Sequence, residues 1–191
     1  MKKLLILAAA LALPLGAQAV SMPGMCTKEI GTDVAKLCSD PAATDGEGML
    51  YALYKAALEK VQGDGSKALQ DDQRKWWDQT KACGKQQAMS QCLHNAYATR
   101  ALQLQEKYKL VKTTGPVNFT CADGSKFKAT FLDMTPALMV AERGDNRLLL
   151  RGEKAASGIQ YASREQQFRE HQGKVTVKWG AEAKELSCKK G

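Results

Sequence analysis

The chain has 191 residues, of which 25% are charged, and its formal net charge is +8. This basic excess is mild, and residues of both signs are interspersed, as they are on an ordinary solvated surface. Basic and aromatic residues do not cluster together, which argues against nucleic acid as a partner.

Residues 1–19 have the features of a secretory signal peptide. Lys2 and Lys3 give a positive start, residues 4–15 form an apolar run, and small residues precede a cleavage site after Ala19. The run is too short to cross a bilayer as a mature helix, and no cysteine directly follows the cleavage site to carry a lipid. We therefore expect a periplasmic protein without a transmembrane segment in its mature chain, with secretion as the alternative.

The cysteines predict structural disulfide bonds. An even number of cysteines favours pairing in an oxidising compartment, and six of them allow fifteen connectivities. A zinc site needs closely spaced pairs such as C-x-x-C, and the sequence contains none. We therefore expect neither a metal nor a cofactor in this protein. The cysteines expected to form disulfides are Cys26, Cys38, Cys83, Cys92, Cys121 and Cys188.

A helical pattern begins near Met49. Apolar residues recur there at spacings of three and four, which places them on one face of a helix. The residues of this face are Leu50, Leu53, Tyr54, Ala57, Leu58 and Val61. Gly63 and Gly65 then break the pattern.

Two further helices are expected over residues 66–83 and 86–109. The stretch before the first helix, residues 20–48, is looser and contains one short helix over 29–38. Residues 20–112 are therefore predicted to form a small helical bundle cross-linked by four cysteines.

Three residues of this bundle invite a functional interpretation. Trp76 and Trp77 are adjacent, so at most one is expected to face the core fully. The other is expected to be half-buried at the rim, with a platform for stacking sugars as the alternative. His94 has no second ligand four residues away on its helix, so it does not predict a metal site.

After residue 112 the pattern changes to short alternating runs. Residues 113–116 read as a turn or linker, and Asp123-Gly124 reads as a hairpin turn. Runs of this length, separated by polar turns, predict an antiparallel barrel or sandwich over 113–191. The expected strands are 117–121, 127–131, 137–141, 147–151, 174–179 and 185–188.

The predicted fold class is α+β, with a small disulfide-linked helical bundle followed by a small antiparallel β-barrel. A bridge between Cys121 and Cys188 would join the first strand of the barrel to the last. By the chain-entropy model, closing that loop is worth roughly 4 kcal/mol, a large share of the stability of a small domain.

The second half resembles the membrane-bound and periplasmic inhibitors of c-type lysozyme. The resemblance covers about 75 residues, and it rests on an ordered set of motifs. These are Phe119-x-Cys121-x-Asp123-Gly124, Phe127-x-Ala129-x-Phe131, Ala156-Ser157-Gly158-x-x-Tyr161 and a closing Cys188. The resemblance implies an eight-stranded antiparallel barrel and, as partner, a c-type lysozyme.

The resemblance also implies roles for single residues. The serine of the family's Ser-Gly-x-x-Tyr loop enters the lysozyme cleft and meets a catalytic carboxylate, and here that serine is Ser157. Gly158 would let the backbone turn sharply and approach closely. Tyr161 would brace the loop rather than touch the enzyme.

One position departs from the family pattern. The family uses a lysine fourteen residues after the serine, where this chain has His171. An imidazole can still donate to a carboxylate, and it does so better when protonated. Lys174 is the alternative donor, and a merely solvated His171 remains open. The departure predicts either weaker inhibition or a different target lysozyme.

The helical half resembles a family of exported helical domains, one of which occurs in a mycobacterial lysozyme-inhibitor lipoprotein. The shared residues are Gln73-x-x-Trp76, Cys83, Cys92-Leu93, Tyr97-x-x-Arg100 and Leu104, with Cys26 and Cys38 upstream. The family's usual Arg-Asp pair before the third cysteine is absent. We expect local pairing of Cys26 with Cys38 and of Cys83 with Cys92.

The favoured hypothesis is a lysozyme inhibitor without enzymatic activity. The alternative is an envelope binding or scaffold protein that uses the helical half as an interaction module. Hydrolysis by Ser157 and His171 is disfavoured, because no G-x-S-x-G elbow surrounds the serine and no acid is placed to orient the histidine.

Overall fold

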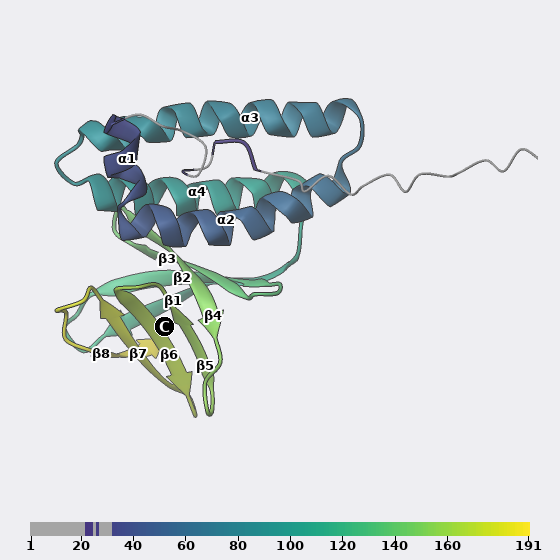
Figure 1. The fold of residues 1–191 in the computed structure, drawn as a ribbon. Coiled ribbons are helices and arrows are strands. Elements are labelled where there is room, and N and C mark those ends of the chain that lie inside the picture. Colours follow the sequence, from purple (N-terminus) through teal and green to yellow (C-terminus); the bar gives the residue numbers. More distant parts are fainter. Residues whose placement is uncertain (1–21, 25, 27–31) are drawn as a thin grey trace, which may run out of the picture.

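The computed structural model describes residues 22–24, 26 and 32–191. The expected signal peptide, residues 1–19, lies outside the described residues. Figure 1 shows a layer of helices lying beside a β-barrel, so the predicted α+β fold class is confirmed. The described part of the chain contains no helix that is both long and apolar enough to cross a membrane.

Within residues 32–108 the helical layer contains four α-helices and one 3-10 helix. These are α1 (Thr32–Cys38), α2 (Pro41–Lys60), α3 (Asp64–Thr80), η1 (Lys81–Lys85) and α4 (Met89–Tyr108). The break expected at Gly63 is present between α2 and α3. The second expected helix ends three residues early, because the chain tightens into η1 after Thr80.

The helix α2 begins eight residues before the expected start at Met49, so the interpretation of residues 41–48 as loose chain is wrong. The carboxylate of Asp40 accepts a hydrogen bond from the backbone N–H of Ala42 at 2.8 Å, and Pro41 occupies the first helical position. Both are strong helix-start features. Gly46 lies inside the helix rather than at its end. A Cβ at this position would overlap the ring of Tyr97, so the close packing of α2 against α4 requires glycine there.

Three disulfides cross-link the protein, and they join the pairs that the sequence suggested. Two are local bridges in the helical half, and the third joins the first and last strands of the barrel. The pairs are Cys26–Cys38, Cys83–Cys92 and Cys121–Cys188.

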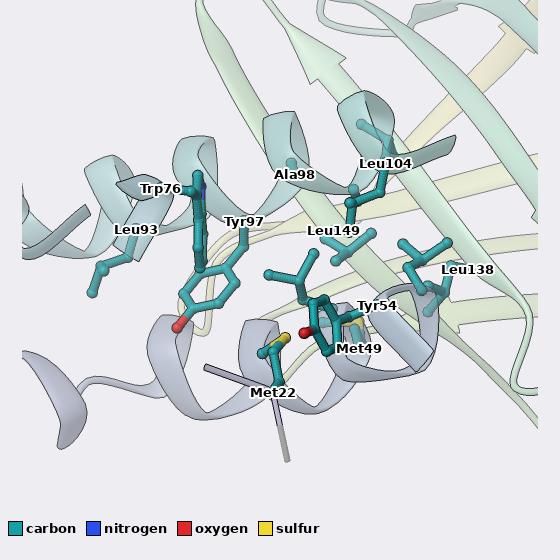
Figure 2. Packing of buried hydrophobic residues seen from close by; sticks show 14 of the residues in the cluster. Met22, Met49, Tyr54, Trp76, Leu93, Tyr97, Ala98, Leu104, Leu138 and Leu149 are labelled. Atoms are coloured by element: carbon teal, nitrogen blue, oxygen red, sulfur yellow. The ribbon is translucent and has the colours of Figure 1, made fainter. Parts of the chain in front are cut away.

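Both adjacent tryptophans are buried, so the expectation of one half-exposed ring is wrong. Trp76 is 9% exposed and meets the ring of Tyr97 edge-on at 5.3 Å between centroids (Figure 2). Trp77 is 1% exposed because the segment at Gly24 covers it, so closely that a Cβ on Gly24 would overlap the indole. Neither ring offers a platform for stacking sugars.

The barrel has eight antiparallel strands in sequential order, and β1 also pairs with β8 to close it. The strands are β1 (Lys112–Cys121), β2 (Lys126–Asp133), β3 (Leu138–Arg143), β4 (Asn146–Glu153), β5 (Ile159–Ala162), β6 (Gln166–His171), β7 (Lys174–Trp179) and β8 (Leu186–Lys190). The six expected strands are present. The pattern missed β5 and β6.

The expected linker at residues 113–116 is part of β1. The register with β2 shifts between Thr114 and Val117, so this segment forms an irregular, bulged stretch of strand. Gly115 allows it, because a Cβ there would lie 2.5 Å from the carbonyl oxygen of Ala129. The division of the chain at residue 112 stays a prediction.

Aromatic side chains fill the barrel interior. Phe119 and Phe127 stack with ring centroids 4.7 Å apart, and Phe168 meets Phe119 edge-on at 5.7 Å. Such arrangements suit the ring quadrupoles and add to the stabilisation from burial. These rings form a packed core within the barrel that fixes the strands carrying the loops.

The helices cover one side of the barrel and share a hydrophobic core with it (Figure 2). Four apolar side chains of the strands belong to the same buried cluster as the helical core: Leu132, Leu138, Val140 and Leu149. The strand β3 is consequently buried on both faces, since Met139 and Ala141 belong to the barrel core.

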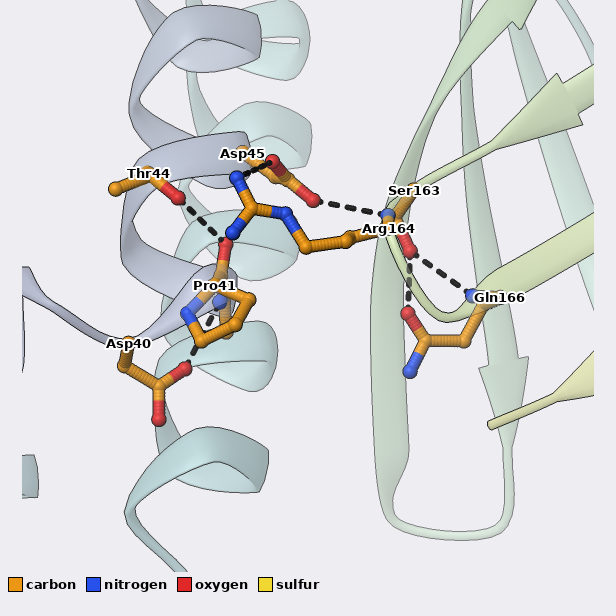
Figure 3. A network of polar contacts seen from close by, with 8 residues as sticks. Asp40, Pro41, Thr44, Asp45, Ser163, Arg164 and Gln166 are labelled. Atoms are coloured by element: carbon orange, nitrogen blue, oxygen red, sulfur yellow. Dashed lines mark hydrogen bonds and ion pairs between the residues drawn. The ribbon is translucent and has the colours of Figure 1, made fainter. Parts of the chain in front are cut away.

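Polar contacts also join the helices to the barrel at the edges of this shared core, and we call the contact region between the two halves the seam. The backbone N–H of Arg164 donates to the carboxylate of Asp45 at 2.9 Å, and the Arg164 guanidinium lies 3.8 Å from the same carboxylate (Figure 3). On another part of the seam, the backbone N–H of Arg147 donates to the Asn95 side chain at 2.6 Å. These contacts join α2 to the β5–β6 connection and α4 to β4.

Candidate functional site

The loop with the candidate serine lies at the tip of the barrel. Residues 154–158 connect β4 to β5, and residues 172–173 connect β6 to β7. Figure 1 shows the two connections side by side at the end of the barrel that points away from the helices. We call these two connections, with the residues that flank them, the tip.

Gly158 brings the two connections together. Its φ of 73° lies in the left-handed region, where glycine is favoured. A Cβ at this position would overlap the carbonyl oxygen of Glu170 and would lie 3.1 Å from the Cα of His171. Only glycine fits both the backbone angle and the close approach, so Ser157 is held beside the end of β6.

The candidate donors at the tip are exposed. Ser157, His171 and Lys174 all have exposed side chains. His171 and Lys174 are direct partners across the β6–β7 hairpin, which turns through Gln172 and Gly173 at φ values of 50° and 76°. Two successive positive φ values are typical of a tight type I′ turn. The structure thus brings together all three donors from the sequence analysis.

The turn is held by a further contact. The backbone N–H of Gly173 donates to a carboxylate oxygen of Glu170 at 2.8 Å. Glu170 is also the register partner of Ile159, the first residue of β5. The β4–β5 loop and the β6–β7 turn are therefore supported by the same pair of strands.

Tyr161 lies beneath the tip and is 9% exposed. Its ring packs against Phe131 at 5.5 Å and Phe168 at 6.3 Å between centroids. Burial raises the pKa of its phenol, and the nearby carboxylate of Asp133 adds to that effect. This position suits a residue that braces the loop from inside, rather than one that touches a partner.

Ile159 is a tip residue that the sequence did not predict. Among the described residues it is the large hydrophobic side chain that stands exposed, at 46%. It directly follows Ser157 and Gly158, so it belongs to the same projecting segment. The available signal was an isolated apolar residue after a run of small and polar ones.

The sequence also gave no sign of a pocket at the tip. The barrel opens there into a cavity of about 550 Å³. Its walls are mainly aromatic and aliphatic, with charged groups that include Lys112, Glu170 and Lys190 among the lining residues. Ile159 and Tyr161 line it as well. An apolar recess thus lies beside the exposed donors.

Metal-binding residues do not gather in the part of the chain that the structure describes. No three His, Cys, Asp or Glu side chains there are placed to hold an ion. His94 is half-buried on α4, and burial lowers its pKa despite the carboxylates of Asp40, Glu165 and Asp45 nearby.

Comparison with known proteins confirms both resemblances seen in the sequence. Residues 119–186 match the model of the family described as "Membrane-bound lysozyme-inhibitor of c-type lysozyme". This match runs from β1 into β8 and includes every tip residue named above.

The chain is also 26% identical over 154 residues to "Lipoprotein LprI" of Mycobacterium tuberculosis (strain ATCC 25618 / H37Rv) and of Mycobacterium bovis (strain ATCC BAA-935 / AF2122/97). The match covers 80% of this chain and 77% of each relative. It is longer than either half of the chain, so it includes parts of both.

Among solved structures, the chain matches "Crystal structure of Pseudomonas aeruginosa MliC in complex with hen egg white lysozyme". The identity is 23% and the TM-score is 0.36, over 42% of this chain and 86% of that chain.

Proposed function

We propose that this protein inhibits a c-type lysozyme by placing the β4–β5 loop in the active-site cleft of the enzyme. The family match over residues 119–186 supports this proposal. The single observation that carries the mechanism is the seating of Gly158 against Glu170. It holds the exposed Ser157 at the tip, next to His171.

The chemistry of the target explains why hydrogen-bond donors are needed. A c-type lysozyme uses two carboxyl groups, one kept protonated by apolar surroundings and one ionised. In the proposed complex the hydroxyl of Ser157 donates to one carboxyl group. His171 or Lys174 donates to the other, and the two stand opposite each other across the hairpin. These contacts occupy the two groups that would otherwise protonate the leaving oxygen and stabilise or attack the sugar.

Ile159 gives this mechanism an apolar component. It stands exposed directly after the Ser157–Gly158 pair. When the loop enters the cleft, this side chain leaves water and gains the favourable free energy of apolar burial. The apolar surroundings of the protonated acid are a suitable place for it.

The tip is also ordered before it binds. The loop is anchored at Gly158, and the strands beneath it are fixed by packed aromatic rings. A loop that is already in its bound shape loses little conformational entropy on binding, which favours affinity. Inhibition by occupying the cleft requires no chemical reaction by the inhibitor, so we propose a protein without enzymatic activity.

The proposed location follows from the same relatives. The matching family is described as membrane-bound and the curated relatives are named lipoproteins, which supports an exported protein of the cell envelope. A cleaved signal peptide over residues 1–19 and release into the periplasm remain part of this proposal.

The position of the Ser157 loop does not support the alternative of a scaffold protein. It would be favoured if the Ser157 loop were buried against the helices. Ser157 and Gly158 are instead exposed, at the end of the barrel that points away from the helices.

The first prediction is that Ser157→Ala weakens inhibition by about tenfold to a hundredfold, because a hydroxyl–carboxylate bond is worth roughly 1.5–3 kcal/mol. The measurement is lysis of a peptidoglycan suspension by a c-type lysozyme over a series of inhibitor concentrations. Ser187→Ala, an exposed serine on β8, is the matched control and should inhibit like the wild type. Equal inhibition constants for all three proteins would remove Ser157 from the mechanism.

A further inference from the structure

The outer wall of the barrel on the side without helices carries a single sign of charge. Six cations stand at outward positions on β2, β6, β7 and β8. They are Lys126, Lys128, Arg169, Lys174, Lys178 and Lys189, and we call them the basic wall.

The strand register places these cations on one face. Thr120 of β1 lies between Lys126 of β2 and Lys189 of β8 as a direct partner of both. Residues directly opposite each other share a face of the sheet, and so do residues two apart along a strand. Lys128 therefore stands on the same face as Lys126.

The other half of the wall follows in the same way. Thr176 of β7 lies between Arg169 of β6 and Ser187 of β8. Lys174 and Lys178 are each two residues from Thr176, and Lys189 is two residues from Ser187. All of them share the outward face, while Val175 and Val177 between them point into the barrel core.

The five strands of the wall carry no acidic residue on this face, and the carboxylates that share it, Glu142 of β3 and Glu153 of β4, stand beyond its two borders. The only carboxylates on β1, β2, β6, β7 and β8 are Asp133 and Glu170, and both line the cavity inside the barrel. The acidic residues of the neighbouring connections, Asp123, Glu182 and Glu185, lie at the end of the barrel opposite the tip.

The cations of the wall are unpaired in the part of the chain that the structure describes. None of the six forms an ion pair there. The Arg169 guanidinium donates to the Gln160 side chain at 3.1 Å, and Gln160 in turn donates to Glu153 at 2.9 Å, so Arg169 makes no direct ion pair. Glu142 faces Lys128 from β3 but pairs with Arg147 at 3.1 Å. Like charges held together on one surface repel one another, and an anion relieves that repulsion.

The composition of the wall narrows the class of partner. The outward residues between the cations are polar, such as Asn118, Thr120 and Thr176; the imidazole of His171 at the tip is the one aromatic ring among them, and none is aliphatic. A wall with one imidazole at its edge offers no row of rings on which nucleobases could stack. It also lacks the apolar anchors that dominate protein–protein interfaces, and side chains that insert into a bilayer.

The shape of the wall favours a flexible polymer as the partner. It is the convex outside of a closed barrel, so a flat surface would meet few of its strands. A flexible chain can follow the curvature. Five of the six cations are lysines, which act as point charges on flexible stems and select charge rather than a fixed planar geometry.

We infer that the basic wall binds the anionic peptidoglycan of the cell wall, whose flexible strands carry repeated carboxylates on their peptides. Bound in this way, the protein would be held on the substrate of the enzyme that it is proposed to inhibit. The binding itself does not rest on the proposed function, because it involves neither lysozyme nor the serine of the tip; Lys174 belongs to both surfaces and is left unchanged in the test.

The test is sedimentation of the mature protein with purified peptidoglycan sacculi over a series of salt concentrations. The variant Lys126→Gln/Lys178→Gln/Lys189→Gln removes three charges from the wall. We expect its apparent Kd to rise by about tenfold or more, and its binding to depend less steeply on salt, because fewer counterions are displaced.

The matched control removes three charges elsewhere. Lys55→Gln/Lys67→Gln/Lys75→Gln changes exposed lysines of α2 and α3 by the same total charge, and it should bind like the wild type. Equal losses in the two variants would show that only net charge matters and would overturn the proposal. Absence of binding by the wild type at low salt would do the same.

Two further measurements separate the remaining explanations. Binding that depends on the wall but occurs only with vesicles of an anionic phospholipid, and not with sacculi, would overturn the choice of glycan. Inhibition of lysozyme on a small soluble substrate should be equal for the wild type and the wall variant, since that assay has no polymer to bind. Failure of the proposed function would appear there for both proteins.

Discussion

Gly158 shows how much of the candidate site depends on one missing side chain. Its backbone angle and its contact with Glu170 each exclude a Cβ. Gly124 in the β1–β2 turn has a similar φ of 80°, but a Cβ there would meet nothing within 4 Å. The two glycines therefore separate the cost of the backbone angle from the cost of the lost contact.

We expect Gly158→Ala to reduce inhibition by at least about tenfold, because the loop must move off Glu170 and carries Ser157 with it. Its free energy of unfolding should also fall by roughly 1–3 kcal/mol. Gly124→Ala should cost only the backbone term, roughly 1 kcal/mol, and leave inhibition unchanged. Parallel urea unfolding and inhibition titrations measure both effects. Full inhibition by Gly158→Ala would show that the contact with Glu170 does not position the loop.

The sequence was informative about single residues only where a motif marked them. Ser157, Gly158 and Tyr161 lie in a spaced motif, and the structure puts all three in or beneath the tip. Ile159 carries no motif of its own, and its exposure depends on how β5 begins. The cavity beside it could not be predicted either, because strands far apart in the sequence form its wall only after the barrel closes.

At the scale of the elements, closure of the barrel rests on the pairing of β1 with β8. The direct partners Cys121 and Cys188 are joined by a disulfide across a sequence separation of 67 residues. The two bridges of the helical half span separations of only 12 and 9 residues. Under the chain-entropy model, the bridge with the longest loop restricts the unfolded chain most.

Removing the barrel bridge by Cys121→Ser/Cys188→Ser should lower the free energy of unfolding by roughly 4 kcal/mol. The control Cys26→Ser/Cys38→Ser should lower it by roughly 3 kcal/mol, because its loop is shorter. Urea unfolding of the two oxidised variants and the wild type measures the difference. A larger loss from the shorter loop would mean that contacts near the bridges, rather than loop length, set their contributions.

The elements that the sequence predicted well have a clear local signal. The strands with alternating apolar residues were found, whereas β5 and β6 were missed because polar residues and glycine dominate the stretch around them. The start of α2 was missed for a related reason. Residues 41–48 contain two glycines and few large apolar side chains, and Gly46 is favourable in the helix only because Tyr97 occupies the space beside it.

At the scale of the whole molecule, the two halves meet along a seam that contains a titratable histidine. His94 is half-buried on α4, with Asp40, Asp45 and Glu165 around it. Burial lowers its pKa, so the folded protein takes up the proton at lower pH than the unfolded chain does. Stability is therefore lost as the pH falls from the unfolded value of about 6.5 towards the lowered folded value.

We expect the Tm of the wild type to fall between about pH 7 and pH 5 in part because of this residue, and His94→Gln to reduce the fall. His171→Gln, at the exposed tip, is the matched control and should keep the wild-type dependence. Thermal unfolding followed by circular dichroism over this pH range tests both variants. Identical pH profiles for all three proteins would mean that His94 titrates alike in the folded and unfolded states.

The packing of the helical half against the barrel could not be predicted from the sequence. The outward residues Leu138, Val140 and Leu149 alternate with equally apolar inward residues, so periodicity alone does not reveal what covers them. In the structure α2 and α4 pack over β3 and β4 and cover these residues.

The closed order of the strands has a consequence for how this protein can recognise anything. Because β1 pairs with both β2 and β8, the sheet has no terminal strand left to accept another. A partner therefore finds no free end of the sheet for strand addition, the mode that open sheets offer to extended peptides. Recognition is left to side chains, at the ends of the barrel and on its outside, where contacts can change without disturbing a single backbone pair of the fold.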